Sequence, residues 1–346
     1  MAETRRFITR KEAKAPFFVG IDLGATGIKV GVVDDLGRPL SWLSIPTEVE
    51  KGPEDASRRM GDAVHRAIRD AALEPNAIAR VGLGSPGGMD IPSGMLTTTI
   101  HLTGWDDFPI RDRVSHECGL PVTFENDANA AAYGEYWVGS GRDFPSMVLL
   151  TLGTGIGCGI IIGELVVQGA HSHGGEAGHI IIDSRDDAQM CGCGGRGHLE
   201  AYASATAVIQ RTREALDAGG ASSLSKRMAT GAELTPKLIA EEAESGDELS
   251  TEIISETARY LGIGVVNVMH VVDPNVVLLG GAMTFGGSES ELGRRFLAQV
   301  KEVVQRLALP IPARDTVIDF ATLGGDAGFI GAAGVARLEY LKQSRP

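Results

Sequence analysis

Two stretches of this chain repeat one pattern, and that repeat constrains the fold more than any other feature. Residues 17–34 read FFVGIDLGATGIKVGVVD, and residues 147–163 read MVLLTLGTGIGCGIIIG. In each, an apolar run ends at Leu-Gly, a turn of Thr and Gly follows, and a second apolar run begins at Ile. With one residue deleted, L-G-T-G-I-x-x-G aligns in both. Such self-similarity predicts a duplicated domain, each copy opening with a β-hairpin, and two similar domains facing each other across a cleft.

Strands and helices alternate along the rest of the chain. Helical periodicity covers residues 56–73, 199–215, 236–244, 249–271 and 325–342, and apolar runs typical of buried strands lie within residues 80–90, 120–126 and 275–283. The scattered glycines and serines of residues 219–235 indicate a surface connection. This alternation predicts an α/β fold.

Composition and charge exclude several classes of function. The 346 residues carry a net charge of −13, and the only basic cluster lies within the first fifteen residues, so nucleic acid is not an expected partner. No apolar run has the length of a membrane span or the pattern of a signal peptide, so we expect a cytoplasmic protein with reduced thiols and no membrane partner. Residues 1–16 are expected to form a disordered basic arm.

The glycine pattern at residues 82–87, GLGSPG, matches a dinucleotide-binding fingerprint but lacks its context. It follows an apolar run, and Asp106 lies about twenty residues further on. The fingerprint requires a helix to begin within the glycines, whereas Pro86 and Pro92 predict a loop. We therefore expect no nicotinamide cofactor, and the absence of G-x-x-x-x-G-K-[ST] excludes a P-loop.

The turns of the two repeats are suited to phosphate. Glycine and threonine let backbone N–H groups and hydroxyls approach an anion closely, so one such turn in each domain suits a nucleotide. Asp22 precedes the first turn, where a carboxylate can hold hydrated Mg²⁺ against phosphates, and Thr26 and Lys29 lie beside it. For either turn alone, a plain hairpin is the alternative, and for Asp22 it is a turn-capping role.

Polar residues crowd the end of a predicted strand in ENDAN, residues 125–129. Asp127 stands where the strand gives way to a helix. An acid at that point often caps the helix, but ligand sites of α/β sheets form at the carboxyl ends of strands. With Glu125, Asn126 and Asn129 beside it, we interpret Asp127 as a general base.

Two of the four cysteines lie in CGCGGRGHLE, residues 191–200. Together with His179 they give H-x11-C-x-C-x4-H, which supplies four ligands of the types that bind zinc tetrahedrally: His179, Cys191, Cys193 and His198. The short spacing of the two cysteines disfavours a mutual disulfide, and a metal-free glycine loop is the alternative. Because four protein ligands leave no place for an activated water, zinc here would shape the loop rather than do chemistry.

Two glutamates lie just before and after these ligands. If zinc folds the loop, Glu176, Glu200 and His179 could converge on a small polar ligand, and paired carboxylates recognise sugar hydroxyls well. The cluster would then shape a sugar-binding wall. The alternative is a stabilising zinc knuckle remote from any ligand.

These motifs, in this order, resemble the ROK family of sugar kinases and repressors, with bacterial ROK glucokinases the nearest match. DLGATGIK, ENDANAAAYGE, LTLGTGIGCG, GGEAGH, CGCGGRGHLE and DPNVVLLGG carry the resemblance from about residue 17 to about residue 341. It implies the actin-like ATPase (ribonuclease H-like) fold, with two similar α/β domains flanking an active-site cleft. The expected small domain is 17–123 plus about 328–346, and the expected large domain is 124–327 with a zinc-binding loop at 176–200. A homodimer or homotetramer is also implied.

The resemblance further implies ATP-dependent phosphorylation of a hexose 6-hydroxyl, with glucose as the expected sugar, and it assigns roles to residues. Asp127 would take the proton from that hydroxyl. ATP and Mg²⁺ would be bound by Asp22, Gly24, Thr26, Lys29, Gly153, Thr154, Gly155, Gly280 and Gly281. The sugar would be bound by Gly88, His101, Asn126, Asp127, Glu176, His179 and Glu200. The structural Zn²⁺ would be held by His179, Cys191, Cys193 and His198.

Two positions depart from the family pattern. His198 stands where the family usually has a third zinc-binding cysteine, and His101 stands where an asparagine that contacts the sugar is common. Imidazole is a competent zinc ligand and can hydrogen-bond a hydroxyl, but its shape and protonation differ from those of an amide. Kinases of fructose, mannose, N-acetylglucosamine or N-acetylmannosamine are therefore alternatives. The Gly280-Gly281 turn favours a nucleotide over polyphosphate as the phosphoryl donor.

A sugar-sensing regulator without kinase activity is the alternative from another class. Repressors of the family carry a winged-helix domain before the first glycine turn, and only about twenty residues precede Asp22 here. Asp127 and both phosphate-type turns are present, which favours an active enzyme.

Overall fold

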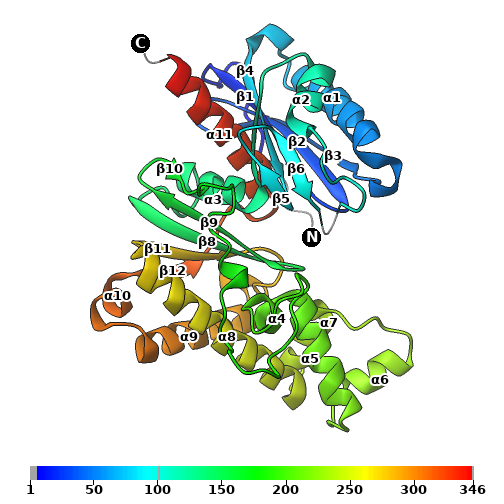
Figure 1. Ribbon diagram of the computed structural model, residues 1–346, viewed down its shortest axis with the longest axis vertical. Coiled ribbons are helices and arrows are strands. Elements are labelled where there is room, and N and C mark those ends of the chain that lie inside the picture. Colours follow the sequence, from blue (N-terminus) through cyan, green and yellow to red (C-terminus); the bar gives the residue numbers. More distant parts are fainter. Residues whose placement is uncertain (1–5, 100–101, 345–346) are drawn as a thin grey trace. The chain divides into compact units, whose positions relative to one another are not determined.

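The computed structural model describes residues 6–99 and 102–344. These residues contain two five-stranded sheets and divide into two compact units (Figure 1). The first unit contains the described residues up to Pro145, Gly159–Gly175 and the described residues from Thr322 onward; the second contains Ser146–Cys158 and Glu176–Ala321. Among the described residues, no helix is both long enough and apolar enough to cross a membrane.

The sheet of the first unit has the strand order β3-β2-β1-β4-β7. The strands are β1 (Phe17–Leu23), β2 (Gly27–Val33), β3 (Pro39–Pro46), β4 (Ile78–Ser85) and β7 (Val122–Asn126). β1 pairs antiparallel with β2 and parallel with β4, and β4 pairs parallel with β7. A separate two-stranded sheet joins β5 (Gly88–Asp90) to β6 (Met95–Thr98).

The second five-stranded sheet repeats this order as β10-β9-β8-β11-β12. Its strands are β8 (Ser146–Leu152), β9 (Ile156–Ile162), β10 (Leu165–Val166), β11 (Val276–Gly280) and β12 (Val317–Phe320). In both sheets the first strand pairs parallel with the fourth, as β1 does with β4 and β8 with β11. The duplicated α/β fold expected from the sequence is therefore confirmed.

Helices cover both faces of the first sheet, so consecutive residues of its central strand β1 are buried. Phe17, Val19 and Ile21 of β1 pack into one core with α1 (Gly52–Asp70) and α2 (Ile110–Cys118). Phe18 faces the opposite core, which includes Phe329 of α11. α11 (Ala327–Ser344) contacts β1 and β4 and packs on α3 (Asp127–Trp137).

Two glycines allow α11 to lie directly on the sheet. A Cβ at Gly82 of β4 would be 1.8 Å from the Ala332 carbonyl oxygen, and one at Gly20 of β1 would be 1.7 Å from the Phe329 carbonyl oxygen. The first glycines of GLGSPG thus belong to β4, and β5 follows at Gly88. No helix begins there, as predicted, and the glycines serve close helix-to-strand packing.

The second unit is rich in helices. They are α4 (Glu200–Ala203), α5 (Ala205–Asp217), α6 (Leu224–Ala229), α7 (Pro236–Glu244), α8 (Glu248–Val272), α9 (Glu291–Leu307) and α10 (Pro310–Asp315). α8 contacts α4, α5, α7 and α9. The predicted helix over residues 199–215 is divided at Ser204, whose side chain caps α5 by accepting a hydrogen bond from the backbone N–H of Ala207. The predicted helices over 236–244 and 249–271 correspond to α7 and α8.

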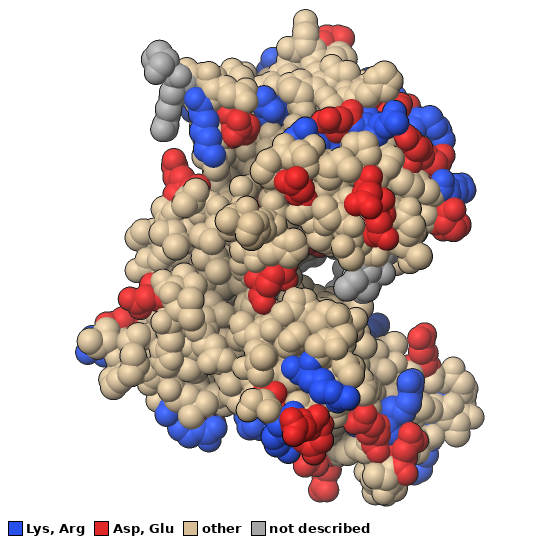
Figure 2. All heavy atoms as spheres, viewed as in Figure 1, with Lys and Arg blue, Asp and Glu red and all other residues tan. Residues whose placement is uncertain are grey.

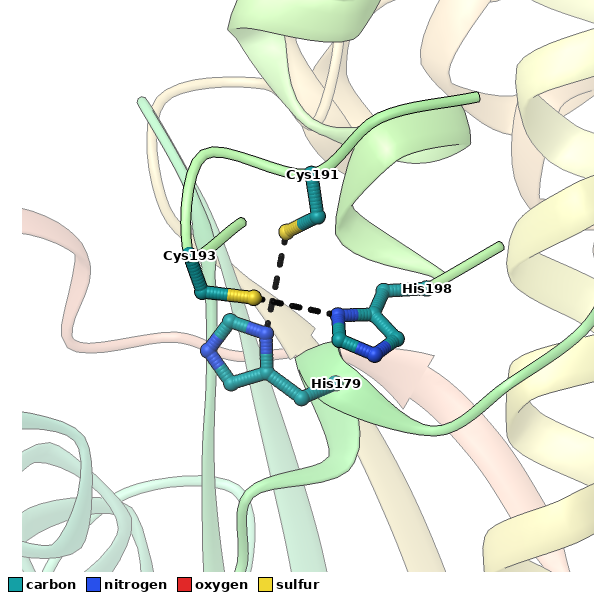
Figure 3. A group of neighbouring side chains, drawn as sticks. All are labelled: His179, Cys191, Cys193 and His198. Carbon is teal, nitrogen blue, oxygen red and sulfur yellow. Dashed lines mark hydrogen bonds between the residues drawn. The ribbon is translucent and has the colours of Figure 1, made fainter. Parts of the chain in front are cut away.

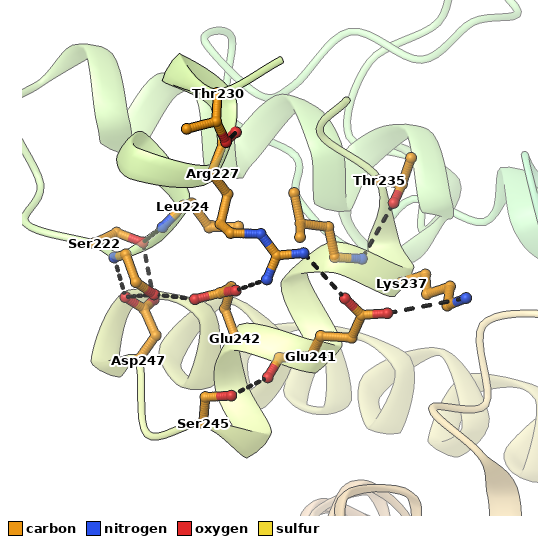
Figure 4. Close-up of polar contacts among 12 residues, drawn as sticks. Ser222, Leu224, Arg227, Thr230, Thr235, Lys237, Glu241, Glu242, Ser245 and Asp247 are labelled. Carbon is orange, nitrogen blue, oxygen red and sulfur yellow. Dashed lines mark hydrogen bonds and ion pairs between the residues drawn. The ribbon is translucent and has the colours of Figure 1, made fainter. Parts of the chain in front are cut away.

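The segment 219–235 is not only a surface connection, because it contains α6. Asp247 fixes this segment by accepting hydrogen bonds from the Ser222 hydroxyl at 3.0 Å and the Ser223 backbone N–H at 2.7 Å (Figure 4). The same carboxylate caps α8 by accepting from the Ser250 N–H at 2.8 Å. Burial acts to raise the pKa of Asp247, but these hydrogen bonds outweigh burial and lower the pKa to about 2.

Residues 6–16 lie against the first unit, in contrast to the expected disordered arm. The Ile8 N–H donates to the Pro39 carbonyl at 3.0 Å, and the Lys14 N–H donates to Asp34 Oδ2 at 3.0 Å. Arg38 Nη2 donates to the Glu12 carbonyl at 2.8 Å. These hydrogen bonds hold residues 6–16 in place. Residues 1–5 lie outside the described residues.

The unit boundaries also differ from the expected domains. Residues 124–145 and 159–175 belong to the first unit, although we expected 124–327 to form one large domain. The packing of α3 on α11 accounts for this assignment, because α11 is itself part of the first unit. On the face in Figure 2, acidic and basic side chains are interspersed, and no continuous basic area is visible among the described residues.

Candidate functional site

The first glycine turn joins β1 to β2 and is braced from the side. The Gly24 N–H donates to the Gly27 carbonyl at 3.0 Å, which closes the turn. Thr47, just after β3, donates its hydroxyl to the Gly24 carbonyl at 2.6 Å, and its N–H donates to the Thr26 carbonyl at 3.2 Å. Thr47, which directly follows β3, thus braces the turn that contains the predicted phosphate-binding residues Gly24 and Thr26.

Asp22 lies at the end of β1, beside the first turn of α11. A Cβ at Gly328 would be 2.5 Å from Asp22 Oδ2, so only glycine leaves room for the carboxylate. Lys29 Nζ donates to Asp22 Oδ2 at 3.2 Å and to the Gly325 carbonyl at 2.9 Å. Lys29 therefore connects Asp22 to the loop that precedes α11. These two contacts give the Lys29 ammonium group partners within the protein, so its position does not require a phosphate.

Asn126 and Asp127 mark the junction of β7 and α3. Asn126 is the N-cap, since its side-chain oxygen accepts from the N–H groups of Ala128 at 2.9 Å and Asn129 at 3.1 Å. Asp127 is the first helical residue, and its Oδ1 accepts from the Ala128 N–H at 2.8 Å. The capping function thus falls to Asn126, and the helix N-terminus favours negative charge at Asp127.

Behind this junction, Glu125 is a buried carboxyl group, 1% exposed. It accepts hydrogen bonds from Gln168 Nε2 at 2.6 Å, Asn129 Nδ2 at 3.0 Å and the Asn126 N–H at 3.0 Å. Burial raises the pKa of Glu125, with these hydrogen bonds acting in the opposite direction. Glu125 fixes the strand-to-helix junction from inside the unit.

The second glycine turn joins β8 to β9 and, like the first, is closed by a backbone hydrogen bond and braced by a neighbouring element. The Gly153 N–H donates to the Gly155 carbonyl at 3.0 Å. The start of α5 braces the turn, because the Ala205 N–H donates to the Gly153 carbonyl at 2.9 Å and the Thr206 hydroxyl donates to the Thr154 carbonyl at 2.9 Å. In both turns, hydrogen bonds from a neighbouring segment therefore fix the backbone.

Glu200, the first residue of α4, lies between this turn and the cysteine loop. Its Oε2 accepts from the Ile156 N–H at 2.8 Å, and its Oε1 lies 3.5 Å from Cys191 Sγ. A Cβ at Gly155 would be 2.3 Å from Oε2. The carboxylate predicted to bind sugar thus also holds the end of the glycine turn.

His179, Cys191, Cys193 and His198 come together in the second unit (Figure 3). Their candidate ligand atoms all lie within 4.8 Å of one another. Cys193 Sγ is 3.2 Å from His198 Nδ1, and Cys191 Sγ is 3.8 Å from His179 Nδ1. In tetrahedral zinc sites with Zn–S near 2.3 Å and Zn–N near 2.1 Å, neighbouring ligand atoms are about 3.4–3.8 Å apart. The donor set therefore fits zinc, and the four side chains are close enough to hold one ion after small movements.

The loop that carries these ligands is held by Tyr202. The Tyr202 hydroxyl donates to Asp183 Oδ2 at 2.8 Å and accepts from the Gln189 N–H at 2.9 Å. The side-chain hydrogen bond from Arg185, followed by that from Tyr202, lowers the pKa of Asp183. The hydroxyl of the buried Tyr202 thus holds both Asp183 and Gln189, which lie at the two ends of the segment before Cys191.

His179 has a further neighbour on its other ring nitrogen. Its Nε2 lies 3.9 Å from Glu176 Oε2, while its Nδ1 faces Cys191. A carboxylate beside the second imidazole nitrogen is a common way of orienting a metal-binding histidine. Glu176 itself is exposed and stands just before the short helical turn Ala177–His179.

The remaining predicted residues have varied surroundings. Gly280 ends β11, and Gly281 has a φ of +93°. A Cβ at Gly281 would be 2.3 Å from the Leu152 carbonyl, so the turn packs on the end of β8. Gly88 begins β5. His101 lies outside the described residues.

The sequence did not identify Thr47 or Gln168 as part of these surroundings. Thr47 contacts Gly24 across 23 residues, and Gln168 contacts Glu125 across 43 residues. Neither residue stands in a recognisable motif, because their contacts arise from strand pairing and loop packing.

The comparisons with known proteins identify the family. The model of the ROK family matches residues 18–339. This chain belongs to the ROK family. As a member, it has the actin-like ATPase fold of two sheet-containing units.

Curated relatives include both enzymes and regulators. A glucokinase of Halalkalibacterium halodurans is 32% identical over 315 residues, which are 91% of this chain and 93% of the relative. A xylose repressor of Caldicellulosiruptor bescii is 30% identical over 291 residues, which are 83% of this chain and 70% of the repressor.

Solved structures agree with this assignment. A ROK hexokinase from Thermus thermophilus matches with a TM-score of 0.78 and 32% identity, covering 95% of this chain and 100% of the other. A ROK family glucokinase from Streptomyces griseus, in complex with glucose and AMPPNP, matches with a TM-score of 0.73 and 32% identity, covering 93% of this chain and 99% of the other.

Proposed function

We propose that this chain is an ATP-dependent hexose kinase that phosphorylates the 6-hydroxyl of glucose. The observation that carries the proposal is Asp127 at the first position of α3, at the carboxyl end of β7, in a family whose members at 32% identity include glucokinases. The S. griseus relative in complex with glucose and AMPPNP supports a sugar and a nucleotide as the two substrates.

In this proposal Asp127 is the general base. It accepts the proton of the sugar hydroxyl as that oxygen attacks the γ-phosphorus of ATP, and ADP leaves. The hydrogen bond that Asp127 Oδ1 accepts from the Ala128 N–H orients the carboxylate, and Asn126 caps the helix on which Asp127 stands. Such a base contributes roughly 10²- to 10⁴-fold to the rate.

The two glycine turns are assigned to the phosphates. Gly24, Thr26, Gly153, Thr154 and Gly155 lie in turns that neighbouring elements brace. The Gly24 and Gly153 N–H groups close these turns, so the hydroxyls of Thr26 and Thr154 are the groups assigned to contact the phosphates. Gly280 and Gly281 are assigned to the adenosine. When bound, Mg²⁺ would neutralise charge on the β- and γ-phosphates, and Asp22 is the carboxylate assigned to hold it.

Lys29 was expected to contact phosphate as well. Its contacts with Asp22 and the Gly325 carbonyl favour a different part, in which Lys29 holds Asp22 in place.

The sugar is assigned to Asn126, Asp127, Glu176, His179 and Glu200, with Gly88 and His101 as further contacts. Zinc held by His179, Cys191, Cys193 and His198 would fold the loop that presents His179 and Glu200. The spacing of the four ligand atoms supports this role. All four positions of a tetrahedral ion would be filled, so the metal would be structural.

Turnover across a panel of sugars tests the proposal. ADP release with Mg²⁺-ATP is measured for glucose, fructose, mannose, N-acetylglucosamine and N-acetylmannosamine. We expect the highest kcat/KM for glucose. A higher kcat/KM for another sugar would support kinase activity but show that glucose is not the preferred substrate. A parallel assay with polyphosphate in place of ATP tests the identity of the phosphoryl donor.

A sugar-responsive regulator is the second candidate, favoured by the xylose repressor at 30% identity. Sugar binding without any ADP release would support it. A dimer or tetramer is proposed for either function, and light scattering on the purified chain gives its mass.

A further inference from the structure

A buried carboxyl group near the C-terminal end of α3 has no part in the site described above. It belongs to Glu135, which is 0% exposed and lies on the same helix as Asp127. Burying a carboxylate is costly unless its oxygens accept hydrogen bonds. The groups that bond to Glu135 therefore indicate what this side chain holds in place.

Hydrogen bonds from two segments converge on the Glu135 carboxylate. The Leu323 N–H donates to Oε1 at 2.6 Å, and the Thr322 hydroxyl donates to Oε2 at 3.3 Å. The N–H and the hydroxyl of Ser140 donate to Oε2 at 3.0 Å and 3.1 Å. The shortest of these bonds thus holds Leu323, in the segment just before α11.

Close packing of α3 on α11 keeps Glu135 beside this segment. A Cβ at Gly134 would be 2.7 Å from the Ala327 carbonyl oxygen, and one at Gly331 would be 1.6 Å from the Ala130 carbonyl oxygen. Glycine at both positions lets the two helix backbones touch. The end of α3 is therefore fixed against the start of α11.

The segment held by Glu135 is a turn that presents a carbonyl group to Lys29. The Asp326 N–H donates to the Leu323 carbonyl at 3.0 Å, which closes the turn. Within it, the Gly325 carbonyl accepts a hydrogen bond from Lys29 Nζ at 2.9 Å. The N–H that Glu135 holds and the carbonyl that holds Lys29 thus belong to one turn.

Lys29 passes this restraint on to Asp22. Its Nζ donates to Asp22 Oδ2 at 3.2 Å, so one ammonium group contacts both the turn and the carboxylate. The Oδ1 atom of Asp22 accepts no side-chain hydrogen bond from the residues that the structure describes. The orientation imposed through Oδ2 therefore decides where Oδ1 points.

We propose that Glu135 is a positioning residue for Asp22. It fixes the turn before α11, and the turn holds Lys29, which orients the Asp22 carboxylate so that Oδ1 is left for hydrated Mg²⁺. The consequence for Mg²⁺ rests on the proposed function. The effect of Glu135 on the position of Asp22 does not.

Glu135→Gln tests the proposal in the full chain, because it keeps the size of the side chain but turns an N–H₂ group toward groups that can only be satisfied by an acceptor. The Mg²⁺ concentration for half-maximal ADP release at constant ATP, called the Mg²⁺ requirement below, should rise at least about threefold. The KM of the sugar should change less than about twofold. The carboxyl carbon-13 NMR signal of Asp22 should shift in the same variant, and this measurement needs no turnover.

Asp34→Asn is the matched control for a purely structural effect. Asp34 lies in the same unit, is also 0% exposed, and accepts hydrogen bonds from the N–H groups of Leu36 and Arg38, both at 3.0 Å. We expect this variant to lower the unfolding temperature, as Glu135→Gln does. It should leave the Mg²⁺ requirement and the Asp22 signal unchanged.

A second pair of variants covers the case in which Glu135→Gln does not fold. Gly324 in the turn has a φ of +53°, Gly119 after α2 has a φ of +67°, and at either glycine a Cβ would meet no atom within 4 Å. Valine disfavours this left-handed conformation, so each substitution acts through the backbone alone. Gly324→Val should raise the Mg²⁺ requirement at least about threefold and shift the Asp22 signal, whereas Gly119→Val should do neither.

Combination with Lys29→Gln tests the path from Glu135 to Asp22. If Glu135 acts through Lys29, adding Glu135→Gln or Gly324→Val to Lys29→Gln should raise the Mg²⁺ requirement by less than about 1.5-fold more. Three results would overturn the proposal: an unchanged Asp22 signal and Mg²⁺ requirement in both test variants, equal changes in the controls, or full additivity with Lys29→Gln. A shifted Asp22 signal in a chain that releases no ADP would contradict only the kinase.

Discussion

Glu200 and Ile156 are joined by a hydrogen bond of 2.8 Å, in which the Ile156 N–H donates to Glu200 Oε2. The other oxygen of the same carboxylate lies 3.5 Å from Cys191 Sγ. One side chain thus contacts both the second glycine turn and the Cys-His cluster. Changes in the zinc-type loop should therefore reach the turn assigned to phosphate.

Gly155→Ala should break this link. The added Cβ would stand 2.3 Å from Glu200 Oε2, so the carboxylate must move away from Ile156. Overpacking of this kind costs about 1–3 kcal/mol of unfolding free energy. Gly153→Ala is the matched control in the same turn, because its nearest atom is 4.0 Å away. Urea unfolding of both variants measures the difference, and equal stabilities would refute the steric account.

Substitution of His198 tests whether this residue is the fourth ligand of the proposed zinc site. His198→Ala should lose the metal, because it removes one of four ligands, whereas His198→Cys should retain it, since thiolate is also a zinc ligand. Metal content by mass spectrometry, measured beside the unfolding temperature, checks both. Zinc retained at one equivalent in His198→Ala would show that the four-ligand site is wrong.

Asp127→Asn tests the general base. We expect kcat to fall by about 10²- to 10⁴-fold while the Kd of the sugar changes little, because the amide keeps the shape but cannot accept the proton. Asp62→Asn, an exposed aspartate of α1, serves as a control that should keep full activity. Undiminished kcat in Asp127→Asn would remove this residue from the mechanism.

Stability at acid pH should depend on Asp247. Its pKa of about 2 in the folded state lies below the usual value near 3.9. A lowered pKa gives stability that is present above the unfolded value and is lost as pH falls through the folded value. Asp247→Asn should therefore be less stable than the wild type above about pH 4, with the difference shrinking toward pH 2. A difference independent of pH would mean that the charge contributes nothing.

The sequence predicted those parts of the molecule whose signals are local. The two glycine hairpins, the junction of β7 and α3 and the four Cys-His ligands each occupy a short stretch in which spacing alone defines the pattern. The duplicated fold followed from the repeated hairpin. For the same reason GLGSPG could be read as a strand and loop from Pro86 and Pro92.

Features that depend on distant contacts could not be predicted in this way. The placement of residues 124–145 in the first unit follows from α3 packing on α11, about 200 residues later in the chain. Lys29 was assigned to phosphate because it stands beside a glycine turn, but its partner at Gly325 lies 296 residues away.

The central claim is transfer of the γ-phosphate of ATP to the 6-hydroxyl of glucose. Phosphorus-31 NMR of the chain with Mg²⁺-ATP and glucose observes it directly. We predict glucose 6-phosphate and ADP in equal amounts, with neither formed above background by Asp127→Asn. No sugar phosphate from glucose or any other hexose of the panel, under conditions in which the sugar binds, would contradict the kinase.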